Sequence, residues 1–225
     1  MIKTLKESKE IAGNVSLGNG KMPGTTYALS ATKCGVGSKL ATVAGSTCAK
    51  CYALRLEKLR PSVHKGWLSN YEKATRTIET NPKQWIAACV FQIKRAFLKT
   101  LEPYHRWFDS GDLQSVAMLS AICEVATLTP DFKHWLPTRE AAIVKAYKAQ
   151  GGVIPGNLVI RVSSTMIGDA PISGHSATST VHRKGIDHIG HSCPASHQGN
   201  SCGTGAGACR ACWSPKVSNV SYPLH

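Results

Sequence analysis

The sequence has no long apolar run. No stretch approaches the ~20 residues that a membrane-spanning helix requires, and the beginning, MIKTLKESKEIAGN, lacks the apolar core of a secretion signal. These absences argue against membrane-embedded and secreted proteins, so we expect a cytoplasmic protein without membrane contacts. A glycine-rich phosphate loop of recognised spacing is also absent, which excludes the commonest nucleotide-binding motif.

Acidic residues are scarce. The 225 residues contain 13 Asp and Glu against 27 Lys and Arg, which gives a formal net charge of +14. Such a basic chain favours an anionic partner such as nucleic acid, a nucleotide or a phosphorylated substrate. Seven metal-bound thiolates and two cluster cores of roughly +2 each would still leave about +11, so metal binding does not remove this expectation. Nothing in the composition indicates an oligomeric state.

Length and hydrophobic content indicate one domain. The chain has 225 residues, 42% of them hydrophobic, which is enough for one sizeable core and short for two. We therefore predict a single α/β domain over residues 1–225. Residues 1–24 are polar and glycine-rich, which predicts an irregular N-terminal arm. Residues 186–216 have few apolar side chains to bury, so we predict a metal-binding segment whose binding energy becomes folding energy.

Strand and helix patterns alternate along the rest of the chain. The patterns predict strands at 27–32, 105–108, 134–137, 157–163, 178–182 and 217–222, and helices at 70–79, 82–100, 113–127 and 139–150. Alternation of this kind implies parallel strands joined by right-handed crossovers. The predicted fold is therefore an open parallel sheet or a partial (β/α) barrel with a cysteine-rich C-terminal segment.

Polar residues follow several of the predicted strands, where chemistry gathers in parallel folds. Asp109, Asp112 and Arg139 are the candidate catalytic residues, because aspartates can hold an amine or act as bases and an arginine can clamp a carboxylate or phosphate. Ser163, Ser164 and Thr165 are candidates for cofactor binding. The alternatives are structural: Asp112 caps a helix beginning at Leu113, Arg139 forms a solvated ion pair, and the hydroxyls satisfy the end of their own strand.

Seven of the nine cysteines form two groups. The first group is Cys34, Cys48 and Cys51, and the second is Cys193, Cys202, Cys209 and Cys212. Because cytosolic thiols stay reduced, ligation is a better explanation than disulfides, and each group ends in a C-x2-C pair, which recurs in zinc and iron–sulfur sites. Cys89 and Cys123 lie in apolar helical patterns and are expected in the core.

The two cysteine groups leave several metal assignments open. Three cysteines suit a [4Fe–4S] cluster with one open iron, whereas the four C-terminal ones could also close a tetrahedral zinc site. The groups could hold one metal centre each, or contribute jointly to a single cluster. A redox-active pair at Cys48 and Cys51 is a further alternative, but it leaves Cys34 without a role.

Two resemblances extend this interpretation. The run GSTCAKCYALR is similar to the cluster loop of radical S-adenosylmethionine enzymes, and that similarity implies a partial barrel, a [4Fe–4S] cluster at Cys34, Cys48 and Cys51, and S-adenosylmethionine as a cofactor. Over nearly its whole length the chain resembles the phage-encoded gene product 88 family, through GSTCAKCYA, RWFDSGD, HWLPTRE, VIRVSST and the tail CPASHQGNSC…CRACW. This second resemblance implies a phage origin and a location in the host cytoplasm.

Together these observations favour a phage-type iron–sulfur protein with a radical-enzyme-like partial barrel. Its expected cofactor is one [4Fe–4S] cluster or two, and its expected chemistry is redox or radical chemistry on a small molecule or nucleotide. The alternative hypothesis is a basic nucleic-acid-binding protein whose cysteines hold structural zinc.

Overall fold

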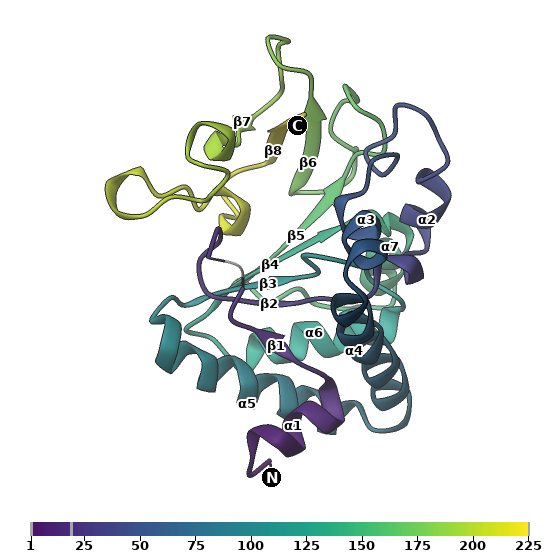
Figure 1. Cartoon of the computed structure of the whole chain (residues 1–225), viewed down its shortest axis with the longest axis vertical. Coiled ribbons are helices and arrows are strands. Elements are labelled where there is room, and N and C mark those ends of the chain that lie inside the picture. The colour runs from purple at the N-terminus through teal and green to yellow at the C-terminus, as the bar shows by residue number, and fades with distance from the viewer. Residues whose placement is uncertain (1, 19, 225) are drawn as a thin grey trace.

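The fold is built on one open, mostly parallel sheet. The computed structural model describes residues 2–18 and 20–224. The sheet order is β1-β2-β3-β4-β5-β6-β8-β7, with β1 antiparallel to β2 and every other pair parallel. The strands are β1 (Val15–Ser16), β2 (Thr25–Tyr27), β3 (Tyr104–Trp107), β4 (Lys133–Thr138), β5 (Leu158–Ser163), β6 (Thr178–His182), β7 (His191–Ser192) and β8 (Asn219–Pro223). Of the two predicted architectures, the open sheet is confirmed, and the sheet does not close into a barrel (Figure 1).

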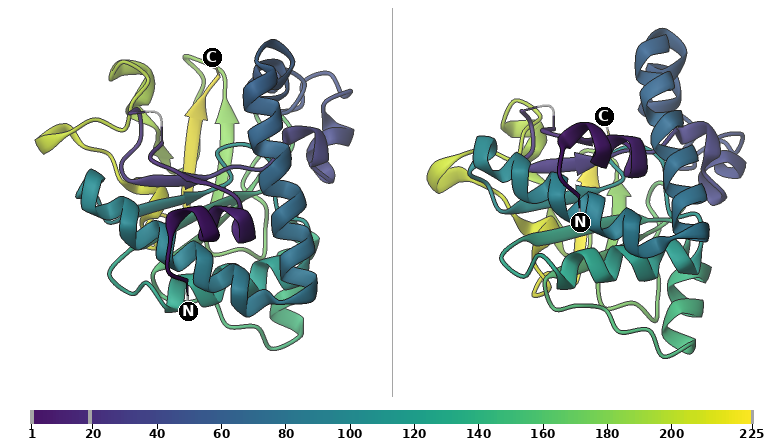
Figure 2. Two further views of the ribbon diagram at one scale, coloured as in Figure 1. Left: turned by 60° about the horizontal axis from the view of Figure 1, so that its bottom comes forward. Right: turned by 90° about the horizontal axis from the view of Figure 1, so that it is seen from below.

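The helices that pack on the sheet gather on one of its faces. The α-helices are α1 (Leu5–Ala12), α2 (Val36–Leu40), α3 (Tyr52–Leu59), α4 (Pro61–Thr80), α5 (Pro82–Thr100), α6 (Val116–Thr127) and α7 (Ala141–Ala149). Figure 2 shows the long helices on the side of the sheet opposite the C-terminal segment. From β2 to β6 the strand order follows the chain without reversal, so right-handed crossovers place each connecting helix on the same face. Within the described chain, no helix combines the length and apolar composition needed to cross a membrane.

Alternate strand residues form the main core against these helices. Tyr27, Trp107, Leu136 and Ile160 stand side by side on four neighbouring strands and are all buried. Apolar side chains of α4–α7 cover them in one continuous cluster. This period-two pattern is what a half-covered sheet requires.

The opposite face carries the other set of strand residues. Arg106 and Trp135 are neighbours on β3 and β4, and Arg161 lies further along on β5. No helix connects the strands on this side of the described chain, and the cysteine-rich segment covers part of it instead. Trp213 of that segment packs edge-on against Trp135, with ring centroids 5.1 Å apart, in a second apolar cluster.

The predicted irregular arm over residues 1–24 instead contains helix α1 and strand β1, while residues 1 and 19 lie outside the described part of the chain. Thr4 caps α1 by accepting from the Glu7 amide, and β1 then extends the sheet. Gly13 has a φ of +79°, and a Cβ there would lie 2.3 Å from Oδ1 of Asn70, so the chain turns closely against α4. Helix α1 is stabilised by these tertiary contacts, which its polar sequence does not indicate.

Several predicted boundaries also shift. Residues 52–80 form α3 and α4, where only 70–79 was predicted helical, and the supposed loop after Cys34 contains the short α2. The helix predicted from Leu113 begins at Val116. Helix 82–100 and strand 178–182 are confirmed with their predicted ends.

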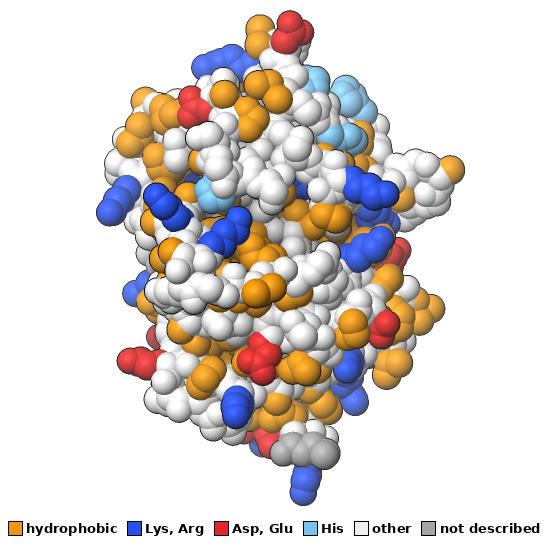
Figure 3. Space-filling view, turned by 180° about the vertical axis from the view of Figure 1, so that it is seen from behind, with side chains coloured by type: hydrophobic (Ala, Val, Ile, Leu, Met, Phe, Trp, Pro, Cys, Tyr) orange, Lys and Arg blue, Asp and Glu red, His pale blue; other side chains and the backbone are white. Residues whose placement is uncertain are grey.

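Seen from behind, the surface of the molecule carries scattered lysine and arginine side chains among fewer acidic ones (Figure 3).

Candidate metal centres

The loop that carries Cys34, Cys48 and Cys51 is fastened to the carboxyl ends of the strands. After β2 the chain makes a short 3-10 turn, Ala31–Lys33, that leads into Cys34. Further along, the amide of Thr47 donates to the carbonyl of Thr165 just after β5, at 2.9 Å. The side chain of Arg139, which follows β4, donates through Nε to Oγ1 of Thr47 at 3.0 Å. The loop therefore lies across the strand ends, at the edge where the sequence predicts chemistry.

The three thiols of this loop are neighbours. The sulfurs of Cys34 and Cys48 lie 3.6 and 3.7 Å from the point that a Cβ of Gly37 would occupy. The pKa of Cys34 is raised to about 12, chiefly by burial and also by the charges of Asp112, Cys51 and Cys48, against the lowering effect of Arg139. Burial likewise raises the pKa of Cys48. In the metal-free chain these two thiols are therefore protonated at neutral pH.

The four C-terminal cysteines form a second group on the helix-free face. The amide of Cys193 donates to Ser221 of β8, that of Cys202 to Lys21, and that of Cys209 to Cys202. Burial raises the pKa values of Cys193 and Cys202, and that of Cys212 to about 12. The charge of Cys209 raises the pKa values of both Cys193 and Cys202, so the thiols of this group are also close neighbours.

Arg161 anchors this group to the sheet. It is 0% exposed although it lies in the middle of β5. Its guanidinium donates to the carbonyls of Ala211, Cys212 and Ser214 and to Thr178, at 2.8 to 3.2 Å. Four acceptors around one buried cation hold the end of the C-x2-C turn in a fixed place.

The two groups lie apart. Figure 1 shows the three-cysteine loop beside α2 and α3 on one side of the sheet, and the cysteine-rich segment by β7 and β8 on the other. All nine thiols are free of disulfides. Within residues 2–18 and 20–224, no three cysteine, histidine or carboxylate side chains are arranged to hold a single metal ion. A metal bound by either group would therefore require its side chains to adjust.

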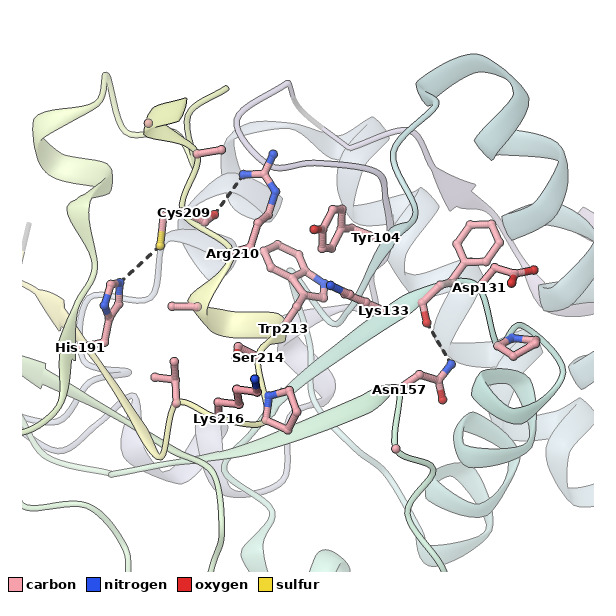
Figure 4. Close-up of a pocket in the computed structure, with 18 of the residues that line it drawn as sticks. Tyr104, Asp131, Lys133, Asn157, His191, Cys209, Arg210, Trp213, Ser214 and Lys216 are labelled. Carbon is pink, nitrogen blue, oxygen red and sulfur yellow. Dashed lines mark hydrogen bonds between the residues drawn. The ribbon is translucent and has the colours of Figure 1, made fainter. Parts of the chain in front are cut away.

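An open pocket of about 980 Å³ borders the second group. Cys209 lies on its wall, with its sulfur 3.4 Å from Nε2 of His191 (Figure 4). Tyr104, Lys133 and Arg210 line the same pocket. A solvent-borne metal or small molecule can thus reach Cys209.

Asp112 has a structural arrangement that the sequence did not indicate. Its Oδ1 accepts from the Leu113 amide and from the Thr138 hydroxyl, and its Oδ2 accepts from the Arg139 amide at 2.9 Å. The carboxylate thus ties the end of β3 to the end of β4. The capping alternative is wrong, because α6 begins at Val116 and Ser115 caps it.

The other residues at the strand ends differ in whether their polar atoms already have hydrogen-bond partners. Asp109 keeps one carboxylate oxygen, Oδ1, buried without a hydrogen-bond partner, while its carbonyl accepts from the hydroxyl of Tyr52. The hydroxyl of Ser163 pairs with Ser179, and that of Ser164 donates to Ala170. Thr165 offers its carbonyl to Thr47. The Ser163 bond joins β5 to β6, and those of Ser164 and Thr165 hold neighbouring loops. Cofactor binding by residues 163–165 stays a prediction.

Sequence reasoning missed three residues that shape these groups: Gly37, Tyr52 and Arg161. Only Arg161 had a usable signal, because a charge inside the apolar strand NLVIRVS requires buried partners. Gly37 and Tyr52 acquire their positions from the path of the loop, which periodicity does not describe.

The chain matches the gene product 88 family over residues 2–215. The chain belongs to this family. No curated protein and no solved structure matches it. The predicted resemblance to the phage-encoded gene product 88 family is therefore confirmed. The predicted similarity to radical S-adenosylmethionine enzymes receives no support from the comparisons.

Replacement of Arg161 tests its role as the anchor of the C-terminal segment. Arg161→Met keeps an unbranched side chain but leaves the carbonyls of Ala211, Cys212 and Ser214 without their donor. We expect a loss of about 3 kcal/mol in the free energy of unfolding and faster proteinase K cleavage within residues 186–216, read by mass spectrometry. The exposed Arg183→Met is the control. Equal cleavage of the two variants would contradict the anchoring role.

The raised pKa of Asp112 predicts that the stability of the fold depends on pH. Burial raises the pKa of Asp112 from 3.8 to about 6, so the folded state holds the proton more tightly than the unfolded state. The contribution of this group to stability is therefore favourable below pH 4 and is lost as pH rises through about 6. Asparagine does not titrate, so Asp112→Asn lacks the stabilisation that the natural chain gains from protonation of Asp112 at low pH. The loss in free energy of unfolding caused by this substitution should therefore be about 1 kcal/mol larger at pH 5 than at pH 7.

Urea unfolding of the metal-free protein at the two pH values measures this difference. A destabilisation that is the same at both would show that Asp112 stays ionised in the fold.

Proposed function

We propose that this gene product 88 protein is an iron–sulfur protein, with a [4Fe–4S] cluster held by Cys34, Cys48 and Cys51. The convergence of these three thiols at the carboxyl ends of the strands is the observation that supports the proposal. They come from both ends of a long loop, yet two of their sulfurs border the same small space beside Gly37. Free thiols brought together in this way are suited to ligating a cluster.

Three ligands leave one iron of such a cluster without a protein side chain. That position is available to a substrate or a cofactor, and the bound cluster would supply the electrons for redox or radical chemistry. Arg139 lowers the pKa values of Cys34 and Cys48 through its charge, so a cation stands close to the proposed centre. An anionic small molecule or nucleotide is therefore the substrate class that this edge favours.

The second cysteine group is proposed to hold its own metal centre, either a second cluster or zinc. Its attachment to β8 and Arg161 places it on another part of the sheet from the first group. S-adenosylmethionine belongs to the same proposal as a candidate ligand of the open iron. If it binds there, its addition to the reduced protein changes the electron paramagnetic resonance spectrum.

Metal analysis of protein purified without oxygen tests the proposal. We expect iron and acid-labile sulfide at about four each per chain for one cluster, or about eight for two. Cys51→Ala should remove the iron of the first group and Cys212→Ala that of the second, whereas Cys123→Ala, a buried thiol outside both groups, should keep all of it. Loss of all iron in both variants would indicate one shared cluster. Zinc without sulfide would reject the proposal and favour structural zinc in a nucleic-acid-binding protein.

Gly37 provides a test that leaves every cysteine in place. Its φ is not in the left-handed region, so Gly37→Ala is compatible with the backbone, but the new methyl group would lie 3.1 Å from Cβ of Cys34 and fill the space between the sulfurs. We expect that variant to lose most of the iron of the first group while remaining folded, as judged by circular dichroism. Gly66→Ala, in a helix with open space around it, is the control and should bind iron normally.

A further inference from the structure

One long part of the chain has almost no acidic residues. Between residues 11 and 71 the only carboxylate side chain is that of Glu57, whereas the same stretch contains eight lysines and arginines. Seven of these cations are exposed: Lys33, Lys39, Lys50, Arg55, Lys58, Arg60 and Lys65. They lie in the three-cysteine loop, in α3 and at the start of α4.

The charge of Glu57 is used inside the protein. Glu57 is 5% exposed. One carboxylate oxygen accepts from the Ala31 amide at 2.6 Å, and the other contacts the Ser30 hydroxyl and Nδ1 of His64 at the same distance. The nearby Glu140 accepts from the Val36 amide and is 9% exposed. These carboxylates hold the loop in place and leave the cations on its surface uncompensated.

Helix α3 presents a regular outer surface at this end of the molecule. Ala53 and Glu57 form its buried side, while Tyr52, Arg55 and Leu59 are exposed at helical spacing. Tyr52 is 60% exposed as a residue, although its hydroxyl donates to the carbonyl of Asp109. The hydroxyl fixes one end of the ring, so a flat aromatic surface stands in solvent beside the cations.

We propose that this surface, formed by the exposed cations of residues 33–65 around Tyr52, binds single-stranded nucleic acid. Phosphates pair with closely spaced lysines and arginines, and an unpaired base can stack on an exposed aromatic ring, which duplex bases cannot do. At physiological salt, charges interact over about 8 Å, so a local cluster matters more than the net charge. This surface adjoins Cys51 and the proposed cluster but does not depend on a metal.

A charge-matched pair of triple variants tests the surface. Lys50→Gln, Arg55→Gln and Lys58→Gln together remove three exposed cations from it, and Lys94→Gln, Arg95→Gln and Lys99→Gln remove three from the exposed side of α5. Binding to a fluorescent oligothymidylate of about 20 nucleotides is measured by anisotropy at several salt concentrations. The first variant should bind at least roughly tenfold more weakly, with a salt slope smaller by about 2, and the control should change less than about twofold.

Equal weakening of both triple variants would show that net charge alone is responsible and would overturn the proposal, as would a natural chain that does not bind the oligonucleotide. Thermal unfolding confirms that each variant is folded, and metal content is measured in parallel. Because the substituted side chains are exposed and are not cysteines, iron content should be unchanged. Loss of nucleic-acid binding is thus distinguishable from loss of the cluster.

Tyr52 tests the preference for single strands. Tyr52→Ala should weaken binding to the oligothymidylate by roughly fivefold or more and leave binding to its duplex with oligoadenylate unchanged, whereas Tyr52→Phe, which keeps the ring, should retain most of the affinity. An equal loss on both nucleic acids would contradict stacking. Anionic phosphatidylserine vesicles are the competing partner, and a first triple variant that loses vesicle binding but keeps oligonucleotide binding would assign the surface to lipid instead.

Discussion

The structure depends on the order of its strands. From β2 to β6 each new strand is added at the same edge of the sheet, and right-handed connections then leave every crossover helix on one face. Doubly wound proteins reverse this order and cover both faces with helices. Here the second face is left to segments that are not helical, and the cysteine-rich segment with its apolar cluster around Trp135 and Trp213 occupies part of it. Both cysteine groups are thus placed by one topological choice, the first at the strand ends and the second on the uncovered face.

Arg161 explains how a segment with little apolar content can fold onto that face. A guanidinium on a buried strand must find hydrogen-bond acceptors, because an unpaired buried charge is strongly unfavourable. The segment supplies three of the four carbonyls that Arg161 contacts, and the indole of Trp213 donates to the His105 carbonyl at 3.0 Å. The same contacts supply acceptors to the buried guanidinium and attach the polar segment to the sheet. A metal in the second group would therefore add to an existing attachment rather than create it.

The elements that could be predicted from the sequence are those whose pattern is set by the main core. Helix α5 was predicted with its ends, since Pro82 marks its first turn and apolar spacing continues to its end. Strand β6 was also predicted with its ends, although none of its residues belongs to that core. The grouping of cysteines was also visible, because C-x2-C pairs are local. Helix α1 was missed because its few buried residues are recognisable only against α4 and α5. The hydrogen bonds of Asp112 to Thr138 and Arg139 join residues that are 26 and 27 positions apart in the sequence. No local sequence pattern indicates that a carboxylate will link two particular strands.

The long gap between Cys34 and Cys48 follows from the route of the loop. Radical S-adenosylmethionine enzymes usually separate the first two cysteines of the cluster loop by three residues. In this chain Cys34 follows β2, whereas Thr47, next to Cys48, is bonded to Thr165 at the end of β5. The sulfurs of Cys34 and Cys48 nevertheless border the same space beside Gly37. The thirteen residues between these two cysteines form α2 and its turns before the chain returns to that space. The Ser46–Met166 bridge and the Arg139–Thr47 hydrogen bond hold the end of the loop that carries Cys48, so the long gap accommodates α2 in a loop whose two ends bring Cys34 and Cys48 to the same space.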